Sequence, residues 1–423
     1  MTPTSARINA KLVRESARVR LQVSPALRIP GLEEPLRTPF QTATPARANV
    51  VSFEVTGLRP DTEYRYAVEV DGEIEEDRQG RFRTFPDRPA SFRVVLASCA
   101  NTGSDHPVFD TIRGLDPLFF LHMGDFHYED ISRPERRLYR RAFDAVFASP
   151  RQSVLYRDVP VAYMWDDHDF GGNNSDRTSR GREAARLTYQ EYVPHYPLPA
   201  GRGDVPIYQA FTAGRVRFIV TDLRSARSPA GSADDAGKTM MGAAQKAWFL
   251  RELLDAHRAG MLVAWVSTDP WIEQKTQGSD RWGGYSTERR EIADFIARHR
   301  IDGRLVVLSG DAHMLAMDDG THSGYSSAGG RGFPVLHAAA LDRRGSVKGG
   351  PYTEGPFPNR TRITRHDGQF AVMEVRDEGG PEICIEWSGR RQQLRTPIVT
   401  ELFHWERCFP APPAPAPASP GPL

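Results

Sequence analysis

The sequence between residues 118 and 130 reads Leu118-Phe119-Phe120-Leu121-His122-Met123-Gly124-Asp125-Phe126-His127-Tyr128-Glu129-Asp130. Its apolar first half is typical of a buried strand, so Asp125 lies where that strand should end, with Tyr128 in the following turn. Aspartate is an oxygen ligand for hard cations, whereas tyrosine must first lose a proton with a pKa of about 10. A strong Lewis acid such as ferric iron can remove that proton, so the spacing indicates a metal site. An ordinary turn is an equally good interpretation of this stretch alone.

Length and charge narrow the class of protein. A chain of 423 residues is too long for one ordinary core and predicts two domains. The hydrophobic share of 39% suits a soluble globular protein, and no apolar stretch approaches the length of a membrane span. A formal net charge of +1 gives no general attraction to nucleic acid, so we expect no specific nucleic-acid recognition, while a local pocket can still bind an anionic substrate. The oligomeric state is left open.

Cysteine usage and the first residues bear on the compartment. The 3 cysteines, Cys99, Cys384 and Cys408, are few, far apart and odd in number, so we expect no disulfide framework. The opening segment from Met1 to Arg7 has neither the apolar core nor the twin arginine of export signals. The expectation is a cytoplasmic protein, or an exported one whose leader has been removed.

The first part of the chain, residues 1–88, is predicted to be a small all-β domain. Apolar and polar residues alternate in the runs 19–23, 51–55 and 64–70, and Asp71-Gly72 is typical of a hairpin turn. The segment Leu58–Tyr66 resembles the tyrosine corner of fibronectin type III and immunoglobulin-like sandwiches. We therefore predict a fibronectin type III-like β-sandwich, although the core tryptophan common in such modules is missing, since the first tryptophan is Trp165.

The second part, residues 89–409, is predicted to be an α/β layered domain, because strands now alternate with longer helical segments. The predicted strands are 92–97, 118–123, 161–165, 216–221, 262–267 and 305–309, with later ones near 370–375 and 382–387. The predicted helices are 135–148, 182–192, 243–257 and 288–299. The proline- and alanine-rich tail, residues 410–423, is predicted to be disordered.

Polar side chains follow the strands of the second part where each strand ends. They are Ser98-Cys99-Ala100-Asn101, Gly124-Asp125, Asp166-Asp167-His168-Asp169, Asp222-Leu223-Arg224 and Gly310-Asp311-Ala312-His313. In open α/β sheets the carboxyl ends of the strands converge on one edge, where ligands bind. The combined set therefore predicts a site more strongly than any one of its members.

Each member of this set also has an ordinary structural explanation. These explanations are a buried small apolar residue (Cys99), helix caps or solvated turn residues (Asp166, Asp167, Asp169), turn residues (Asn173, Asn174), a core histidine (His313) and a surface ion pair (Arg224). Asp125, Asp311 and His313 are the strongest candidates, because both Gly-Asp turns directly follow apolar strands.

With these motifs in place, the chain resembles the PhoD family, which comprises alkaline phosphatases and phosphodiesterases of the metallophosphoesterase superfamily and is related to purple acid phosphatases. The resemblance is carried by Ser98-Cys99-Ala100-Asn101, Gly124-Asp125-x-x-Tyr128-x-Asp130, Trp165-Asp166-Asp167-His168-Asp169-x-Gly171-x-Asn173, Asp222-x-Arg224 and Ser309-Gly310-Asp311-x-His313. It extends to about Pro410. It implies a layered metallophosphoesterase β-sandwich flanked by helices, and hydrolysis of a phosphate ester by two metals that activate hydroxide.

The resemblance also implies roles for individual residues. Iron, taken as ferric, would be held by Cys99, Asp125, Tyr128 and His313. Asp125 would bridge to a second metal, calcium in the best-known relatives, which Asn173, Asp311 and Asp167 would help to bind, with Asp130 as a weaker candidate. His168 and Arg224 would face the substrate phosphate.

The chemistry of these residue types agrees with the implied roles. Thiolate, phenolate and carboxylate bring negative charge to a trivalent ion, and oxygen ligands suit a hard second ion, for which manganese or magnesium would serve as well as calcium. Histidine can protonate a leaving alkoxide, and arginine can hold phosphoryl oxygens. The choice between Asp167, Asn173 and Asn174 as ligand stays open, and His127 has no assigned role.

Two other functions are compatible with the sequence. A phospholipase D-like diesterase could use the same site, since specificity would rest on a pocket rim. That rim could include Trp271, Trp282, Tyr285 and the glycine-rich stretch 323–333, although core packing explains the aromatic residues at least as well. The other alternative is an inactive, sandwich-fronted binding protein, against which the intact set of metal-ligand residues speaks.

Overall fold

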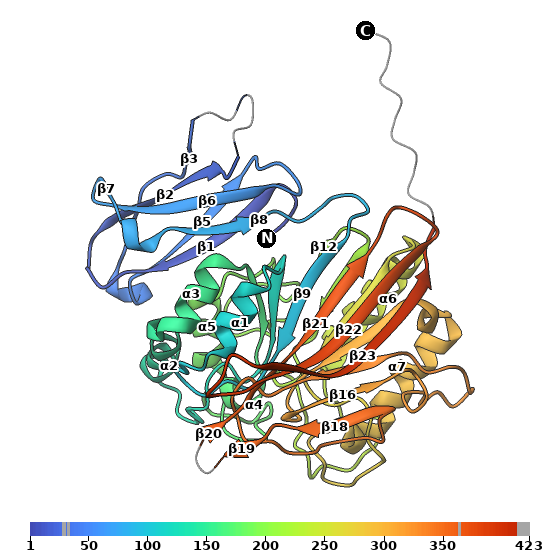
Figure 1. Ribbon diagram of the computed structural model, residues 1–423. Coiled ribbons are helices and arrows are strands. Elements are labelled where there is room, and N and C mark those ends of the chain that lie inside the picture. The colour runs from blue at the N-terminus through green and yellow to red at the C-terminus, as the bar shows by residue number, and fades with distance from the viewer. Residues whose placement is uncertain (28–30, 32–33, 363–364, 413–423) are drawn as a thin grey trace.

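A computed structural model of the protein describes residues 1–27, 31, 34–362 and 365–412, and two large sheets form its centre (Figure 1). The first sheet runs in the order β11 (Val161–Met164), β10 (Phe119–Met123), β9 (Phe92–Ala97), β21 (Gly368–Arg376), β22 (Glu382–Gln392) and β23 (Val399–Pro410). The second runs in the order β12 (Gln209–Ala213), β13 (Val216–Val220), β14 (Leu262–Ser267), β15 (Leu305–Ser309), β17 (Val335–Ala338), β16 (Met314–Asp318) and β18 (Glu354–Pro358).

The two sheets pack face to face through apolar side chains. The ring of Phe119 on β10 lies 5.4 Å from that of Phe211 on β12 and 5.2 Å from that of Phe218 on β13, measured between centroids. Inside each sheet the strands predicted from apolar runs are parallel: β9, β10 and β11 in one, and β13, β14 and β15 in the other. Their carboxyl ends therefore point to the same edge of the sandwich.

Helices cover both outer faces of the sandwich. The helices are α1 (Val108–Gly114), α2 (Arg136–Ala148), α3 (Pro150–Asp158), α4 (Asp167–Phe170), α5 (Arg182–Tyr192), α6 (Gly242–Arg258) and α7 (Ser286–Arg298). Helices α1 and α3 pack on the first sheet, where Phe109 and Leu155 meet Val95 and Phe120. Helices α6 and α7 pack on the second sheet, where Phe249 and Ile292 share a core with Trp265. The expected mixed α/β architecture is confirmed.

The first residues of the chain form further β-structure. Strand β1 (Ser5–Lys11) pairs with β5 (Val50–Thr56), and a second sheet contains β2 (Arg18–Pro25), β3 (Leu36–Arg37), β4 (Gln41–Thr42), β6 (Glu63–Val70), β7 (Glu73–Ile74) and β8 (Gly80–Arg83). The predicted tyrosine corner is present, because the hydroxyl of buried Tyr64 accepts a 2.9 Å hydrogen bond from the Arg59 N–H. The fibronectin type III-like assignment and the domain limit at residue 88 stay predictions.

This β-rich part docks on the helical side of the sandwich, as the blue strands in Figure 1 show. The Tyr66 hydroxyl donates to the Arg157 carbonyl at the end of α3 (2.9 Å), and the Asn9 amide donates to the Tyr192 carbonyl at the end of α5 (3.0 Å). These contacts lie away from the carboxyl edge of the sheets.

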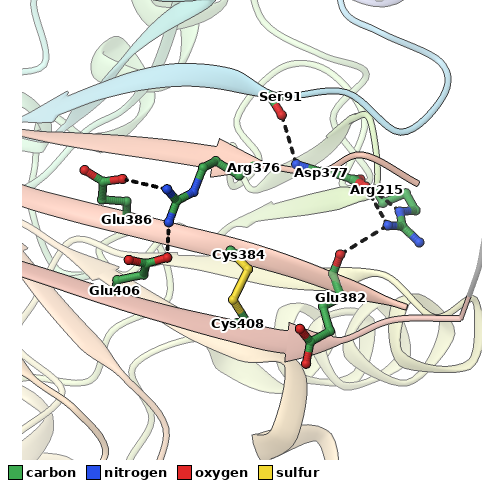
Figure 2. The surroundings of a disulfide bond; sticks show 9 residues. All are labelled: Ser91, Arg215, Arg376, Asp377, Glu382, Cys384, Glu386, Glu406 and Cys408. Carbon is green, nitrogen blue, oxygen red and sulfur yellow. Dashed lines mark hydrogen bonds and ion pairs between the residues drawn. A yellow bond between two sulfur atoms is a disulfide. The ribbon is translucent and has the colours of Figure 1, made fainter. Parts of the chain in front are cut away.

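The expectation about cysteines is wrong. Cys384 on β22 and Cys408 on β23 lie opposite each other and form a disulfide, beside which Arg376 forms ion pairs with Glu386 and Glu406 (Figure 2). Their separation of 24 residues hid this pairing, because the register of two antiparallel strands brings them together and β23 was not predicted. Cys99 is the free, buried cysteine.

The predicted start of the disordered tail is also too early. Strand β23 runs to Pro410, and buried Ala411 donates its N–H to the Pro381 carbonyl (2.7 Å). The rest of the predicted tail, residues 413–423, lies outside the described residues. Within the described part, no helix has the length and apolar character needed to cross a membrane.

Candidate metal centre

The polar residues predicted to converge do meet at the carboxyl edge of the two sheets. Cys99 follows β9, Asp125 follows β10, and Asp311 and His313 follow β15. All four have positive φ angles, 63°, 55°, 57° and 51° respectively, a region that residues other than glycine rarely occupy. Several such conformations in one place are common at functional sites, where the surrounding fold holds them.

One group at this edge, the mixed-ligand cluster, consists of Cys99, Asp125, Tyr128 and His313. The Tyr128 hydroxyl lies 2.7 Å from Asp125 Oδ2 and 2.9 Å from His313 Nε2, and Cys99 Sγ lies 3.5 Å from Asp125 Oδ2. The Arg344 carbonyl lies 2.8 Å from His313 Nδ1, which fixes the orientation of the imidazole ring. The structure therefore brings together all four residues that were predicted to hold iron.

A second group, the carboxylate cluster, consists of Asp125, Asp166 and Asp311. Each is buried, and one carboxylate oxygen of each lies within 4.8 Å of the others. Among the described residues, no hydrogen-bond partner reaches Asp125 Oδ1, Asp166 Oδ2 or Asp311 Oδ2. Buried carboxylate oxygens without partners are costly, so this cluster is suited to a cation.

Electrostatics in the centre reflect crowded acidic groups. Burial raises the pKa of Asp125 well above its usual value, and neighbouring carboxylates add to the effect. Burial, followed by the charge of Asp125, also raises the pKa of the Cys99 thiol and of the Tyr128 phenol. Asp311 differs: burial opposes ionisation, but Lys348 keeps its pKa below the ordinary value. Cations among these groups would favour their ionised forms.

Asp169 holds the loop that carries Asp125 and Tyr128. Its Oδ1 accepts hydrogen bonds from the N–H groups of Phe126 (2.7 Å) and His127 (3.1 Å), and its Oδ2 accepts from the Asp166 N–H (3.0 Å). Asp169 therefore has a structural role, as a helix-cap residue would, and its carboxylate connects two loops of the centre by hydrogen bonds.

Arg224 has protein carboxylates as its partners in this structure. It is fully buried, and its guanidinium donates to Asp166 Oδ1 (2.5 Å) and to Asp269 Oδ1 (3.0 Å), while Arg227 also binds Asp269. The sequence placed Arg224 correctly at a strand end but gave no sign of Asp269, which lies 45 residues further along the chain. Its predicted contact with substrate phosphate stays a prediction, and this geometry favours a positioning role.

Asp167 and His168 lie at the start of α4, beside the carboxylate cluster. Asp167 is buried and forms a group with Asp125 and His168 whose ligand atoms lie within 4.8 Å of one another. Burial opposes ionisation of Asp167, but the charges of Arg224 and His168 lower its pKa. The ring of His168 lies 4.1 Å from that of Tyr128, between centroids, and its Nδ1 lies 2.5 Å from Asp130 Oδ1.

Asn173 and Asn174 differ in burial from the other candidate ligands. Asn173 and Asn174 are both exposed in the loop after α4. The Asn174 backbone N–H, rather than its side chain, contacts the centre by donating to Asp167 Oδ2 (2.6 Å). Ligation of the second metal by Asn173 stays a prediction. The side chains that lie beside the Asp125 carboxylate are instead those of Asp166 and Asp167.

Lys348 is a member of the centre that sequence reasoning missed. Its Nζ lies 2.6 Å from Asp311 Oδ1, and its side chain keeps 28% exposure. Arg343, which was also missed, stacks its guanidinium 3.7 Å from the centroid of the Tyr128 ring. Both residues lie in a loop without regular secondary structure, so neither a strand end nor a motif marked them.

The burial of three aromatic residues and of His127 bears on roles that the sequence left open. Trp271, Trp282 and Tyr285 are all fully buried, so core packing is the correct explanation for them. His127 is also fully buried, and among the described residues neither ring nitrogen has a hydrogen-bond partner. Burial, with a contribution from His168, lowers its pKa to about 3, so it is a neutral residue beside Phe143.

The donor sets fit the two implied metals. Thiol, phenol, imidazole and carboxylate together suit a ferric ion, whose charge would favour the deprotonated thiol and phenol. Among the described residues, the three carboxylate oxygens without partners suit a hard divalent ion. Asp125 belongs to both clusters, as a bridging ligand must.

Comparison with known proteins agrees with this centre. The sequence model of the PhoD-like phosphatase family matches residues 93–337, a span that contains every predicted metal-ligand and catalytic residue. Two Mycobacterium tuberculosis proteins named Uncharacterized protein Rv2577 and Uncharacterized protein MT2654 are each 25% identical over 284 residues, or 61% of this chain and 49% of theirs. The chain thus spans about half the length of these curated relatives.

A solved structure of PhoD has the same fold. It superposes with a TM-score of 0.77 at 16% identity and covers 99% of this chain and 91% of that chain. At this identity the likeness is one of fold, and the family assignment rests on the sequence match over residues 93–337, more than half of the protein. The chain belongs to the PhoD-like phosphatase family.

Proposed function

We propose that the chain is a metal-dependent hydrolase of phosphoric esters, an alkaline phosphatase or phosphodiesterase that uses iron and a second metal, with calcium as our first choice and manganese or magnesium as alternatives. The observation that carries the proposal is the buried group of Asp125, Asp166 and Asp311, whose partnerless oxygens lie beside Cys99 and Tyr128. Membership of the PhoD-like phosphatase family supports the same reaction class.

The two clusters divide the ligands. The iron would be held by Cys99, Tyr128 and His313. The second metal would be held by Asp166, Asp167 and Asp311, and Asp125 would contact both metals. Asn173 would add a ligand only if its loop moved inward. Bound there, two metals supply an activated hydroxide and charge stabilisation for displacement at phosphorus.

The chain itself supplies proton transfer and orientation. His168 is part-exposed at the start of α4, and its hydrogen bond to Asp130 orients the ring; in this proposal it gives a proton to the leaving alkoxide. Lys348, part-exposed beside Asp311, is placed to meet a phosphoryl oxygen. Arg224, through Asp166, positions the second-metal ligands.

Two measurements test the proposal together. Elemental analysis of the purified protein should find iron near one per chain together with a second metal, and a tyrosinate charge-transfer band should colour the protein. Hydrolysis of p-nitrophenyl phosphate and bis-p-nitrophenyl phosphate should be measured before and after chelation and after each metal is restored. Turnover that survives complete metal removal, or no turnover of either ester by the fully loaded protein, would refute the proposal.

A further inference from the structure

A polar pocket, here called the side pocket, opens beside the candidate metal centre. It is lined by the residues at 132–135, at 172–173, at 175–176 and at 178–180. Apart from Pro134 and Gly172, every lining residue is polar or charged. The pocket therefore offers polar groups to a hydrophilic ligand.

One wall of the side pocket contains the lining residues at 132–135, and the other contains those between 172 and 180. Both walls are linked to residues of the centre. On one side, Asp130, close to Ser132 in the same loop, is hydrogen-bonded to His168 Nδ1. On the other side, the Asn174 N–H donates to Asp167 Oδ2 (2.6 Å), and the Ser175 hydroxyl donates to the Asp167 carbonyl (2.9 Å). His168 is thus linked through Asp130 to the loop of one wall, and its neighbour Asp167 is linked to the loop of the other.

The walls are also attached to each other, so the pocket exists before any ligand binds. The hydroxyl of buried Tyr139 on α2 lies 2.6 Å from the Ile131 carbonyl and 3.3 Å from the Phe170 carbonyl. Gly181, at the end of the second wall, packs so closely on this hydroxyl that a Cβ there would collide with it. A preformed pocket lowers the entropic cost of binding.

The side pocket contains two arginines without partners. Within the described ranges, neither Arg133 nor Arg180 forms a hydrogen bond or an ion pair. The acidic lining residues are already engaged: Glu135 pairs with Arg137 (2.5 Å), and Asp176 Oδ1 accepts two hydrogen bonds from Thr178. The lining therefore offers two guanidinium groups that no carboxylate of the described residues pairs with, beside the remaining charge of Asp176.

We propose that Arg133 and Arg180 bind a second phosphate group of the substrate, carried on the alcohol side of the ester bond that is broken. Guanidinium groups bind phosphate oxygens through paired, charge-assisted hydrogen bonds, and serine and asparagine in the lining can add further donors. This assignment rests on the proposed function. It makes the preferred substrate a phosphorylated phosphate ester.

Equilibrium binding tests this assignment without relying on turnover. Alkane bisphosphonates of increasing length, which hydrolases do not cleave, are compared with alkyl monophosphonates by calorimetric titration of the metal-loaded protein. We expect the best bisphosphonate to bind at least about tenfold more tightly than the matched monophosphonate. The double variant Arg133→Gln/Arg180→Gln should lose this preference. The control variant Arg251→Gln/Arg290→Gln, which removes two exposed charges on α6 and α7, should keep it.

Hydrolysis separates this inference from the proposed function. The double variant should cleave p-nitrophenyl phosphate as the unaltered protein does. Its kcat/KM should fall about tenfold only on a substrate with a second phosphate. The two substrate pairs to compare are fructose 1,6-bisphosphate with fructose 6-phosphate, and the dinucleotide pTpT with TpT. The pair that shows the loss identifies a small monoester or a chain diester as the source of the second phosphate. Failure of the metal-loaded, unaltered protein to cleave both p-nitrophenyl phosphate and bis-p-nitrophenyl phosphate would refute the proposed function. Equal binding of bisphosphonate and monophosphonate, or a preference that survives in the double variant, would refute the inference.

Discussion

The mixed-ligand cluster and the carboxylate cluster share Asp125 and the same sheet edge, yet their polar atoms are satisfied in different ways. In the mixed-ligand cluster, Tyr128 bridges Asp125 and His313 by hydrogen bonds of 2.7 and 2.9 Å. In the carboxylate cluster, each aspartate keeps an oxygen for which the described part of the chain provides no partner, and the positive charges of Arg224 and Lys348 compensate from outside.

The difference indicates how one site can choose two different metals. A cluster of thiol, phenol and imidazole selects by ligand softness and must lose protons on binding, whereas a carboxylate cluster selects a hard ion by charge. The four predictions that follow test this division of labour, from the largest expected effect to the smallest.

Removing the shared ligand should disable both clusters. In Asp125→Asn we expect iron and the second metal to fall together and phosphatase activity to drop by about a thousandfold or more, because two-metal stabilisation of the displacement is lost. Elemental analysis and p-nitrophenyl phosphate hydrolysis measure both effects. Asp255→Asn, at an exposed position on α6, is the control. Retention of either metal at full occupancy would show that the clusters are independent.

Removing Arg224 should destabilise the protein at the carboxylate cluster. In Arg224→Met the free energy of unfolding should fall by about 3–5 kcal/mol, because the buried Asp166 and Asp269 lose their common cation. Chemical denaturation of metal-loaded protein measures the loss. If stability were unchanged while KM for phosphate esters rose, Arg224 would instead contact substrate, as the family resemblance implies.

Removing the phenol should affect the mixed-ligand cluster alone. In Tyr128→Phe we expect the visible absorption band to disappear and activity to fall at least about tenfold, while the content of the second metal stays unchanged. Absorption spectroscopy and elemental analysis of the same sample give both values. Tyr66→Phe, in the β-rich first part, should leave the band intact. An unchanged spectrum in Tyr128→Phe would exclude tyrosinate ligation.

Removing the lysine should affect the carboxylate cluster alone. Lys348 occupies Asp311 Oδ1 and competes with an incoming cation, so Lys348→Met should bind calcium about tenfold more tightly after metal stripping. Calorimetric titration measures this, with Lys275→Met, at a side chain that is 69% exposed, as the control. Weaker calcium binding in Lys348→Met would show that the lysine assists the site rather than competing for it.

The sequence predicted much of the fold because apolar runs and amphipathic periods are local. The strands before Cys99, Asp125 and Asp311 and the four predicted helices are all present, with bounds that agree within a few residues. Strands β12, β16, β17, β18 and β23 were missed, although β16 and β17 are short, fully buried runs. The missed β23 also explains the missed disulfide, since Cys408 lies on it.

The sequence predicted most residues of the candidate site, and the structure changed the roles of some of them. Residue types at strand ends indicated Cys99, Asp125, Tyr128 and His313, and the fold brings these together. The choice among neighbouring acids depended on side-chain direction: within Asp166-Asp167-His168-Asp169, one aspartate joins the carboxylate cluster, one joins His168, and one ties the loops.

By itself, the sequence determined the strands, the acidic turns that follow them and the chemistry of their side chains, because these depend on residues close together in the chain. Only the tertiary structure decided that Arg224 binds Asp269, that Lys348 pairs with Asp311, and that Arg133 and Arg180 share one pocket. The physical reason is that these partners belong to loops distant in sequence. Their positions follow from how two sheets and the surrounding helices pack, which no local pattern records.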